Sequence, residues 1–346
     1  MSEGVRQVLA TLRAAQGEAR SGEALSSALG VSRAQIWKHV SALRRRGYGI
    51  EGEPGGGYRL ESLPDRLYPD ELSHGRDHRW LGSAIEHLEE TDSTNRVAME
   101  RGRGGAPHGF AVVAEGQTAG RGRLGRSFYS PANLNLYTSV VLRPDVLVSD
   151  ASTLILAAGV AVADAVAHAV GDDDAVSIKW PNDVQLGGLK TSGILLELAA
   201  EETRVDFVVM GIGVNLNVDR SDFPDEFRHL ATSLRSHLGA PVDRVAFTRR
   251  LFDTLEDALD AHASGGFEAL RPRFDRRFRM PGERVEVRGV GAAEPEVMRG
   301  VVRGLAPDGA LELEDEAGRI QRVLAGDVTI VKPPAERAAR QEELAR

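Results

Sequence analysis

The sequence predicts a multidomain α+β protein with a helical domain first, a mixed sheet with helices next, and a small antiparallel β-barrel last. Residues 1–62 combine apolar residues at helical spacing with a glycine-rich turn between two short apolar runs. The middle of the chain mixes strand-like and helix-like segments without regular β-α-β alternation, which favours an α+β sheet with helices on one side. From about Met280 onward, short apolar runs separated by glycine turns are typical of a barrel.

The composition of the 346 residues is that of an ordinary globular protein, with 42% hydrophobic and 27% charged residues. No apolar run approaches the ~20 residues that span a bilayer, and the N-terminus lacks the apolar core of a signal peptide. The chain has no cysteine, which excludes disulfides and thiolate nucleophiles. We therefore expect a cytoplasmic protein without a membrane partner. The nine histidines show no metal-ligand spacing, so no protein metal site is predicted.

The charge is distributed unevenly along the chain. Residues 1–62 contain nine Lys/Arg and six Asp/Glu, a net charge of +3, whereas the whole chain carries −8. The remaining residues therefore carry −11. A basic end on an acidic body indicates that one end meets a polyanion.

The first domain has the pattern of a winged helix-turn-helix. The spacing predicts helices over residues 5–14 and Gly22–Leu29, and Ser32 is a suitable N-cap for a third helix over Arg33–Arg46. A hairpin should follow, with its turn at Pro54-Gly55-Gly56-Gly57.

The third helix carries basic residues and no acidic residue, and base contacts usually come from the N-terminal part of such a helix. A basic protein-interaction domain is the alternative to DNA binding. The candidate DNA contacts are Ser32, Arg33, Gln35, Lys38, Arg44, Arg45 and Arg46.

The composition suggests four regions. Two prolines within Leu63–Leu72 indicate a linker after the first domain. We expect domains at 1–62, 63–279 and 280–332, and a charged, solvated tail at 333–346. In the second domain, strands are predicted over Phe110–Ala114, Leu134–Leu142, Val176–Trp180, Lys190–Ala200 and Phe207–Asn217, and helices over 151–170 and 241–262.

The segment Gly-Arg-Gly-Arg-Leu-Gly-Arg at residues 120–126 directly follows a predicted strand. Glycine permits positive φ and close backbone approach, and arginine supplies a planar fork for carboxylate or phosphate. The composition suits a loop that closes over an anionic small molecule. A flexible basic surface loop or a nucleic-acid contact fits the segment equally well.

Three more polar clusters stand at strand ends or in loops. Asp92–Asn95 fits a helix cap as well as a ligand site, and Lys179 before Trp180-Pro181-Asn182-Asp183 is either a held cation or a solvated strand end. Lys190 opens a third cluster, Lys-Thr-Ser-Gly. Asn215, in an apolar run, is either a satisfied core amide or a ligand contact.

Together these motifs resemble the biotin–protein ligases, in the same order and at similar spacing. The resemblance rests on Asp92–Asn95, Gly120–Gly125, Lys179–Asp183, Lys190–Glu197 and Gly211–Asn215. The basic first domain is similar to that of the bifunctional subgroup, which also represses the biotin operon. The resemblance implies a central domain like the class II aminoacyl-tRNA synthetases and an SH3-like barrel.

The resemblance implies formation of biotinyl-5′-AMP from biotin and ATP, with Mg²⁺ arriving with ATP, and transfer of biotin to a carrier-protein lysine. Lys179, Lys190 and Arg121 would be catalytic. The implied biotin contacts are Ser93, Thr94, Asn95, Gln117, Arg121, Gly122, Arg123 and Lys179, and the implied ATP contacts are Arg121, Arg123, Asn182, Asp183, Lys190 and Asn215.

The implied partners are a biotin carboxyl carrier protein, operator DNA and, once the adenylate is bound, a second copy of the chain. Three alternatives remain. The chain could be a ligase without repressor activity, or a non-catalytic biotin-sensing transcription factor. The two lysines Lys179 and Lys190 argue against the sensor, because binding of biotin alone needs no phosphate contacts. A lipoate ligase is the third.

Overall fold

The computed structural model describes residues 1–53, 56–77, 79–289 and 297–331, and the chain divides into two compact units, Met1–His74 and Gly75–Arg346. The tail expected at 333–346 lies outside the described residues. So do Pro54 and Gly55 of the expected hairpin turn. The domain boundaries expected at 62/63, 279/280 and 332/333 stay predictions.

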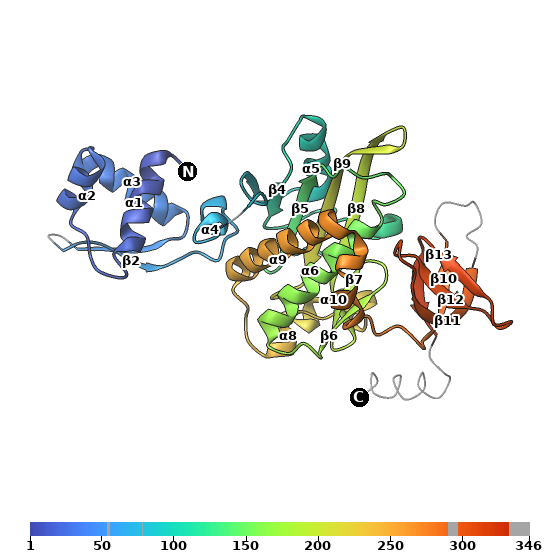
Figure 1. Ribbon diagram of the computed structural model, residues 1–346. Coiled ribbons are helices and arrows are strands. Elements are labelled where there is room, and N and C mark those ends of the chain that lie inside the picture. Colours follow the sequence, from blue (N-terminus) through green and yellow to red (C-terminus); the bar gives the residue numbers. More distant parts are fainter. Residues whose placement is uncertain (54–55, 78, 290–296, 332–346) are drawn as a thin grey trace. The chain divides into compact units, whose positions relative to one another are not determined.

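The first unit contains the predicted winged helix-turn-helix (Figure 1). Its helices are α1 (Glu3–Ala14), α2 (Gly22–Leu29) and α3 (Arg33–Arg45), and its hairpin pairs β1 (Gly49–Glu53) with β2 (Gly57–Ser62). The Ser32 hydroxyl caps α3 by accepting from the Gln35 backbone N–H at 3.2 Å. The apolar faces of the helices meet in a core that includes Leu12, Ile36 and Val40.

The segment expected to be a plain linker contains a short helix, α4 (Pro69–Ser73), that packs within the first unit. Leu67 and Leu72 are fully buried, and the Glu71 carboxylate, 1% exposed, accepts hydrogen bonds from Arg13 and Tyr48. Prolines signalled a break in the chain, but these long-range contacts have no local sequence signal.

The second unit is built on a seven-stranded sheet in the order β3-β4-β5-β9-β8-β7-β6. The β3–β4 pair is parallel and the other pairs are antiparallel. The strands are β3 (Ile85–Leu88), β4 (Phe110–Ala114), β5 (Leu136–Leu142), β6 (Val176–Lys179), β7 (Asp183–Leu186), β8 (Leu189–Glu201) and β9 (Arg204–Val214). The five strands predicted in this region are confirmed, whereas β3 and β7 are additional.

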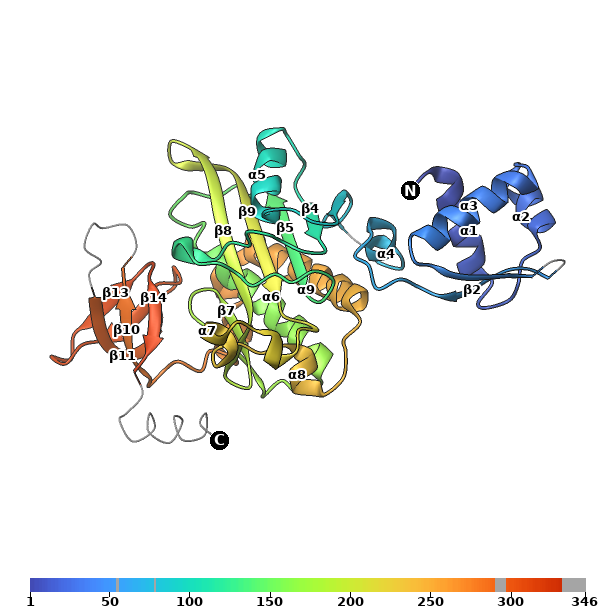
Figure 2. The same cartoon turned by 180° about the vertical axis from the view of Figure 1, so that it is seen from behind.

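Helices lie on both faces of this sheet, which corrects the expectation of one covered side. The long helices α6 (Thr153–Val170) and α9 (Arg244–Gly265) cover one face, as Figures 1 and 2 show from opposite sides. On the other face, α5 (Thr94–Arg103) packs Val97 and Ala98 against Phe207 and Val209 of β9. By length and composition α6 could cross a membrane, but 72% of it is buried inside the protein.

Shorter helical elements complete the second unit. They are η1 (Arg123–Gly125), η2 (Arg220–Asp222), α7 (Asp225–Arg228), α8 (Leu234–Leu238), η3 (Phe267–Ala269) and α10 (Arg271–Asp275).

The expected C-terminal barrel is a five-stranded antiparallel sheet in the order β13-β12-β11-β10-β14. Its strands are β10 (Arg284–Arg288), β11 (Val297–Leu305), β12 (Leu311–Glu314), β13 (Ile320–Val323) and β14 (Asp327–Ile330). The hydrogen bonds that join it to the central sheet region include one from Trp180 Nε1 to the Gly309 carbonyl at 3.0 Å and one from Arg271 Nη1 to the Leu305 carbonyl at 3.1 Å.

Candidate functional site

Three glycines on β8 and β9, Gly193, Gly211 and Gly213, form the floor of a cavity on the α5 side of the sheet. A Cβ atom at Gly211 would lie 1.9 Å from Asn95 Oδ1, and one at Gly213 would lie 2.6 Å from the Phe128 ring. Glycine is therefore required here so that the Asn95 and Phe128 side chains can lie directly on the strands.

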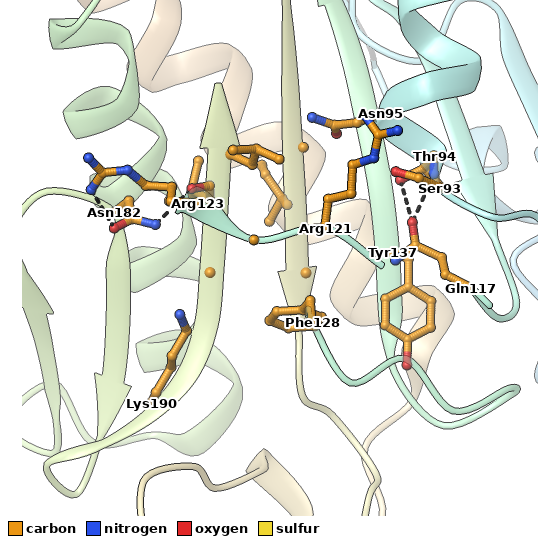
Figure 3. A pocket seen from close by; sticks show the side chains of 17 residues that line it. Ser93, Thr94, Asn95, Gln117, Arg121, Arg123, Phe128, Tyr137, Asn182 and Lys190 are labelled. Atoms are coloured by element: carbon orange, nitrogen blue, oxygen red, sulfur yellow. Dashed lines mark hydrogen bonds between the residues drawn. The ribbon is translucent and has the colours of Figure 1, made fainter. Parts of the chain in front are cut away.

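The cavity gathers most of the polar residues that the sequence singled out (Figure 3). Its volume is about 50 Å³, well below the ~300–1,000 Å³ of ordinary ligand pockets. A ligand of ordinary size therefore needs the surrounding loop and side chains to move outward. The sequence-predicted residues in its lining are Ser93, Thr94, Asn95, Gln117, Arg121, Gly122, Arg123, Asn182 and Lys190.

Uncharged hydrogen-bonding groups line one end of the cavity, beside the Arg121 guanidinium and the Glu197 carboxylate (Figure 3). The Gln117 side-chain oxygen accepts from the Thr94 backbone N–H at 2.8 Å and from the Thr94 hydroxyl at 3.1 Å (Figure 3). Ser139 Oγ donates to Asn95 Oδ1 at 2.6 Å, and Asn95 Nδ2 donates to Glu197 at 2.8 Å. These mutual bonds hold the side chains in fixed rotamers around the cavity.

Asp92–Asn95 also makes the predicted helix start, because Ser93 is the N-cap residue of α5. Its hydroxyl makes no capping bond, and Asp92 instead accepts from the Ser93 N–H at 2.7 Å. The hydrogen bond from Arg96, outweighing partial burial, lowers the pKa of Asp92 to about 2.

The glycine–arginine loop crosses the cavity with two of its arginines directed into the lining (Figure 3). Arg121 lies 3.8 Å from Glu197, and Arg123 donates to Asn182 Oδ1 at 3.2 Å and to the Gly326 carbonyl at 3.3 Å. Burial lowers the pKa of Arg123, although the charge of Asp183 opposes this. Leu124 adopts a left-handed backbone (φ 58°, ψ 34°), which costs a non-glycine residue roughly 1–2 kcal/mol.

The third arginine of the loop, Arg126, is paired with Asp327 of β14. Although burial opposes the change, the hydrogen bond from Arg126 keeps the pKa of Asp327 below its ordinary value. The charges of Lys179 and Arg123 act in the same direction. The loop is therefore tied to the barrel as well as to the central sheet.

Lys190 supplies the cation at the other end of the cavity, where its Nζ lies 2.6 Å from Asp183 Oδ1. Asn182 Nδ2 donates to the Ile194 carbonyl at 2.9 Å, which presents Oδ1 to Arg123 (Figure 3). Cations and uncharged polar groups thus share one small space.

Three sequence-predicted residues do not line the cavity: Lys179, Asp183 and Asn215. Lys179 ends β6 opposite Asp183 in the β6–β7 register. Asn215 is buried just beyond β9 and donates to the Thr232 carbonyl at 3.1 Å, while its Oδ1 is buried without a hydrogen-bond partner among the described residues. The structure therefore brings nine of the expected residues together and leaves these three beside the cavity.

Sequence reasoning missed several lining residues. Phe128 and Tyr137 face each other edge to face, with ring centroids 6.5 Å apart, and burial raises the pKa of Tyr137. Ile194, Leu195 and Ile212 add apolar surface. The glycines at every second position of β9 were a usable signal, because they predict a close approach from a bulky side chain.

In the first unit, most of the seven predicted DNA-contact residues interact with other residues of the chain. Arg33 pairs with Glu23 of α2 at 2.6 Å, Arg44 Nε donates to the Ile50 carbonyl at 2.9 Å, and the Arg46 guanidinium stacks 3.9 Å from the centre of the Tyr68 ring. Gln35 is partly buried and its amide lies 3.4 Å from the His39 ring.

Lys38 and Arg45 remain directed to solvent. Lys38 has no hydrogen bond or ion pair to the described part of the chain, and Arg45 makes one contact, 3.4 Å to the Ser41 carbonyl. The basic character of α3 is therefore concentrated on part of its surface.

Family models match three segments of the chain. The biotin/lipoate A/B protein ligase family matches residues 88–215, a helix-turn-helix domain matches 5–59, and the biotin protein ligase C-terminal domain matches 282–331. The three matches coincide with the mixed sheet, the helical unit and the barrel.

Several relatives are similar to this chain over most of its length. The bifunctional ligase/repressor BirA of Bacillus spizizenii is 34% identical over 90% of this chain and 93% of its own, and that of Escherichia coli is 32% identical over 91% and 94%. A biotin protein ligase from Aquifex aeolicus in complex with biotin and ATP superposes with a TM-score of 0.61 and 28% identity, covering 72% of this chain and 100% of that one. The chain belongs to the family of biotin protein ligases that includes the bifunctional ligase/repressor BirA proteins.

Proposed function

We propose that this protein forms biotinyl-5′-AMP from biotin and ATP and transfers biotin to a lysine of a carrier protein. Bound to that adenylate, it also represses genes of biotin synthesis and transport. The observation that carries the proposal is one cavity in which uncharged hydrogen-bonding groups and three cations, Arg121, Arg123 and Lys190, meet. The helix-turn-helix match at residues 5–59 supports the repressor activity.

The end of the cavity that holds the uncharged hydrogen-bonding side chains suits biotin. Its ureido ring needs both donors and acceptors, which Thr94, Asn95 and Gln117 can supply, together with Ser93 at the helix start. The side chains of Ile194 and Ile212 offer apolar surface for the rest of the molecule. The rise from about 50 Å³ to a biotin-sized space requires outward movement of the loop and of Phe128.

The charged end suits the reacting phosphate. In the first step a biotin carboxylate oxygen forms a bond to the α-phosphorus of ATP, and pyrophosphate leaves with the electrons of the broken P–O bond. Negative charge collects on the phosphate oxygens, so Arg121, Arg123, Lys179 and Lys190 would stabilise it electrostatically. Asn182, Asp183 and Asn215 would lie toward ATP.

The second step needs no nucleophile from the enzyme. The carrier lysine amine attacks the acyl carbon of the mixed anhydride, AMP leaves, and the amine loses a proton. The absence of cysteine from the sequence is compatible with such direct transfer.

Mg²⁺ would accompany ATP rather than occupy a site made by the protein alone. Among the described residues, no three His, Asp or Glu side chains gather as a metal site. The Asp183 carboxylate and the unpartnered Asn215 Oδ1 are oxygen ligands of the kind that Mg²⁺ accepts alongside substrate phosphates. Asp183 would hold the ion, which would neutralise phosphate charge.

Repression would depend on the adenylate through the loop. Ordering a loop costs conformational entropy, which contacts with the adenylate would offset. The ordered form would pair as a homodimer and present two α3 helices to two operator half-sites in the cytoplasm.

Two assays test the two activities separately. Labelled biotin should be transferred to a purified carrier domain, and equimolar lipoate should not compete; efficient use of lipoate would favour a lipoate ligase. Gel shifts with a biotin-operon fragment should tighten on addition of biotin plus ATP. DNA binding that is equally tight with and without biotin and ATP would indicate a ligase without this regulation.

A further inference from the structure

One face of α3 carries a large apolar side chain that the core does not use. The core of the first unit takes Ile36, Val40 and Leu43 from this helix, all fully buried. Trp37 projects away from that core with 59% of its surface exposed, the most exposed tryptophan of the described residues. Trp37 is not among the residues that form the core of this unit.

Trp37 lies among cations on the outward surface of α3. Residues spaced by four share a helix face, so Arg33, Trp37 and Ser41 form one row, and Ala34 and Lys38 form the neighbouring row. Arg45 continues this surface one turn further on and is exposed. No acidic residue occurs within α3, although Arg33 pairs with Glu23 of α2.

The hairpin offers no comparable surface. Its cation, Arg59, is bracketed by Glu51 and Glu61, with Arg59 Nε 2.5 Å from Glu61. Its positive charge is therefore neutralised within the hairpin. The positively charged surface that could contact a polyanion is therefore that of α3.

We propose that Trp37, flanked by Lys38 and Arg45, contacts base edges in the major groove of duplex DNA, and that its indole recognises the C5-methyl group of thymine. This inference rests on the proposed repressor function. An α-helix fits the major groove, and the thymine methyl is the apolar feature displayed there. Lys38 and Arg45 would contact phosphates on either side of the indole.

The same geometry argues against base contacts by Gln35, which is one of the predicted DNA-contact residues. Glutamine can recognise adenine through a bidentate amide, but Gln35 is partly buried and its amide faces His39. Base contacts therefore shift from Gln35 to Trp37, which is exposed two residues later.

The test uses full-length protein with biotin and ATP. A duplex is first selected from a random pool by the wild-type protein, and its affinity is measured by fluorescence anisotropy. Each thymine is then replaced in turn by deoxyuridine, which removes only the methyl group. At one or two positions per half-site the replacement should weaken wild-type binding about fourfold, the ratio expected for one buried methyl.

The Trp37→Ala variant should bind the selected duplex at least tenfold more weakly and lose this deoxyuridine effect, to within twofold at every position. Trp37→Met, which keeps an apolar contact, should retain part of it. Lys38→Ala should reduce the slope of log affinity against log salt by about one. Arg6→Ala, which removes a cation of α1, is the matched control and should change the affinity less than twofold.

Three results would overturn the inference. If Trp37→Ala, shown by circular dichroism to be folded, keeps the wild-type deoxyuridine profile, Trp37 does not contact thymine. If the variant loses self-association but keeps DNA affinity, the indole belongs to a protein contact. If the wild-type protein enriches no sequence at all, the repressor function itself fails along with the role of Trp37.

Discussion

The guanidinium of Arg126 donates to both carboxylate oxygens of Asp327, a residue 201 positions later, with Nη1 3.1 Å from Oδ1. Arg123 adds a hydrogen bond to the neighbouring Gly326 carbonyl. Through these contacts, the start of β14 and the residue before it support the loop that crosses the candidate site. The barrel is therefore structurally continuous with the site.

Removing the charge of Asp327 should loosen the loop. In Asp327→Asn we expect labelled biotinyl-adenylate to leave the enzyme about three- to tenfold faster, because a partly exposed ion pair contributes only ~1 kcal/mol. Filter retention of the labelled intermediate over time measures this. The matched control is Glu314→Gln, which breaks a pair with Arg303 elsewhere on the barrel. Equal retention by Asp327→Asn and wild type would show that the barrel contact does not support the loop.

Adding one methyl group to the cavity floor should impair biotin binding. The new Cβ of Gly213→Ala would project from the cavity floor into the space that biotin takes once Phe128 has moved outward, and overpacking of this kind costs ~1–3 kcal/mol. The KM for biotin should rise about five- to a hundredfold in the adenylation assay. Gly304→Ala is the control, because a Cβ there meets no atom within 4 Å. An unchanged KM would mean that biotin does not bind above Gly213.

Lys179 is a predicted catalytic residue that does not line the cavity. Its substitution therefore tests whether the reacting phosphate comes within reach of this lysine. If loop movement brings it to the phosphate, Lys179→Ala should reduce adenylate formation about a hundredfold or more, the effect of losing an oxyanion-type donor. Lys179→Arg should recover part of the rate, since the charge is kept. Near-normal single-turnover rates in Lys179→Ala would remove Lys179 from the catalytic set.

Stability should fall on acidification because of His262. This side chain is 7% exposed, its Nε2 lies 2.7 Å from Thr153 Oγ1, and burial lowers its pKa from 6.5. The folded state then binds its proton less readily than the unfolded state, so its contribution is complete above pH ~6.5 and is lost as the pH falls through the folded-state pKa. The Tm should therefore decrease between pH 7.5 and 5, with a shallower decrease in His262→Gln. Parallel Tm–pH curves for the two proteins would contradict this assignment.

Much of the fold could be predicted because its signals are local. Periodicity and capping residues located α2 at Gly22–Leu29 and β4 at Phe110–Ala114 without error. These element bounds depend on neighbours in sequence. The convergence of the motif residues on one cavity, by contrast, was expected from the resemblance to the biotin–protein ligases.

What could not be predicted depends on contacts between distant residues. Arg46 was expected on the DNA surface, but it stacks on Tyr68 from the segment expected to be a linker. Phe128 had no interpretable role until Gly193 and Gly213 were seen beneath its ring.

We propose that one cavity activates biotin with ATP. Exchange of labelled pyrophosphate into ATP measures this step without any carrier protein or DNA. We expect exchange that depends on biotin, is not supported by lipoate, and falls sharply in Arg121→Ala. Exchange that proceeds equally with and without biotin, or no exchange by folded protein with biotin and Mg²⁺-ATP, would contradict it.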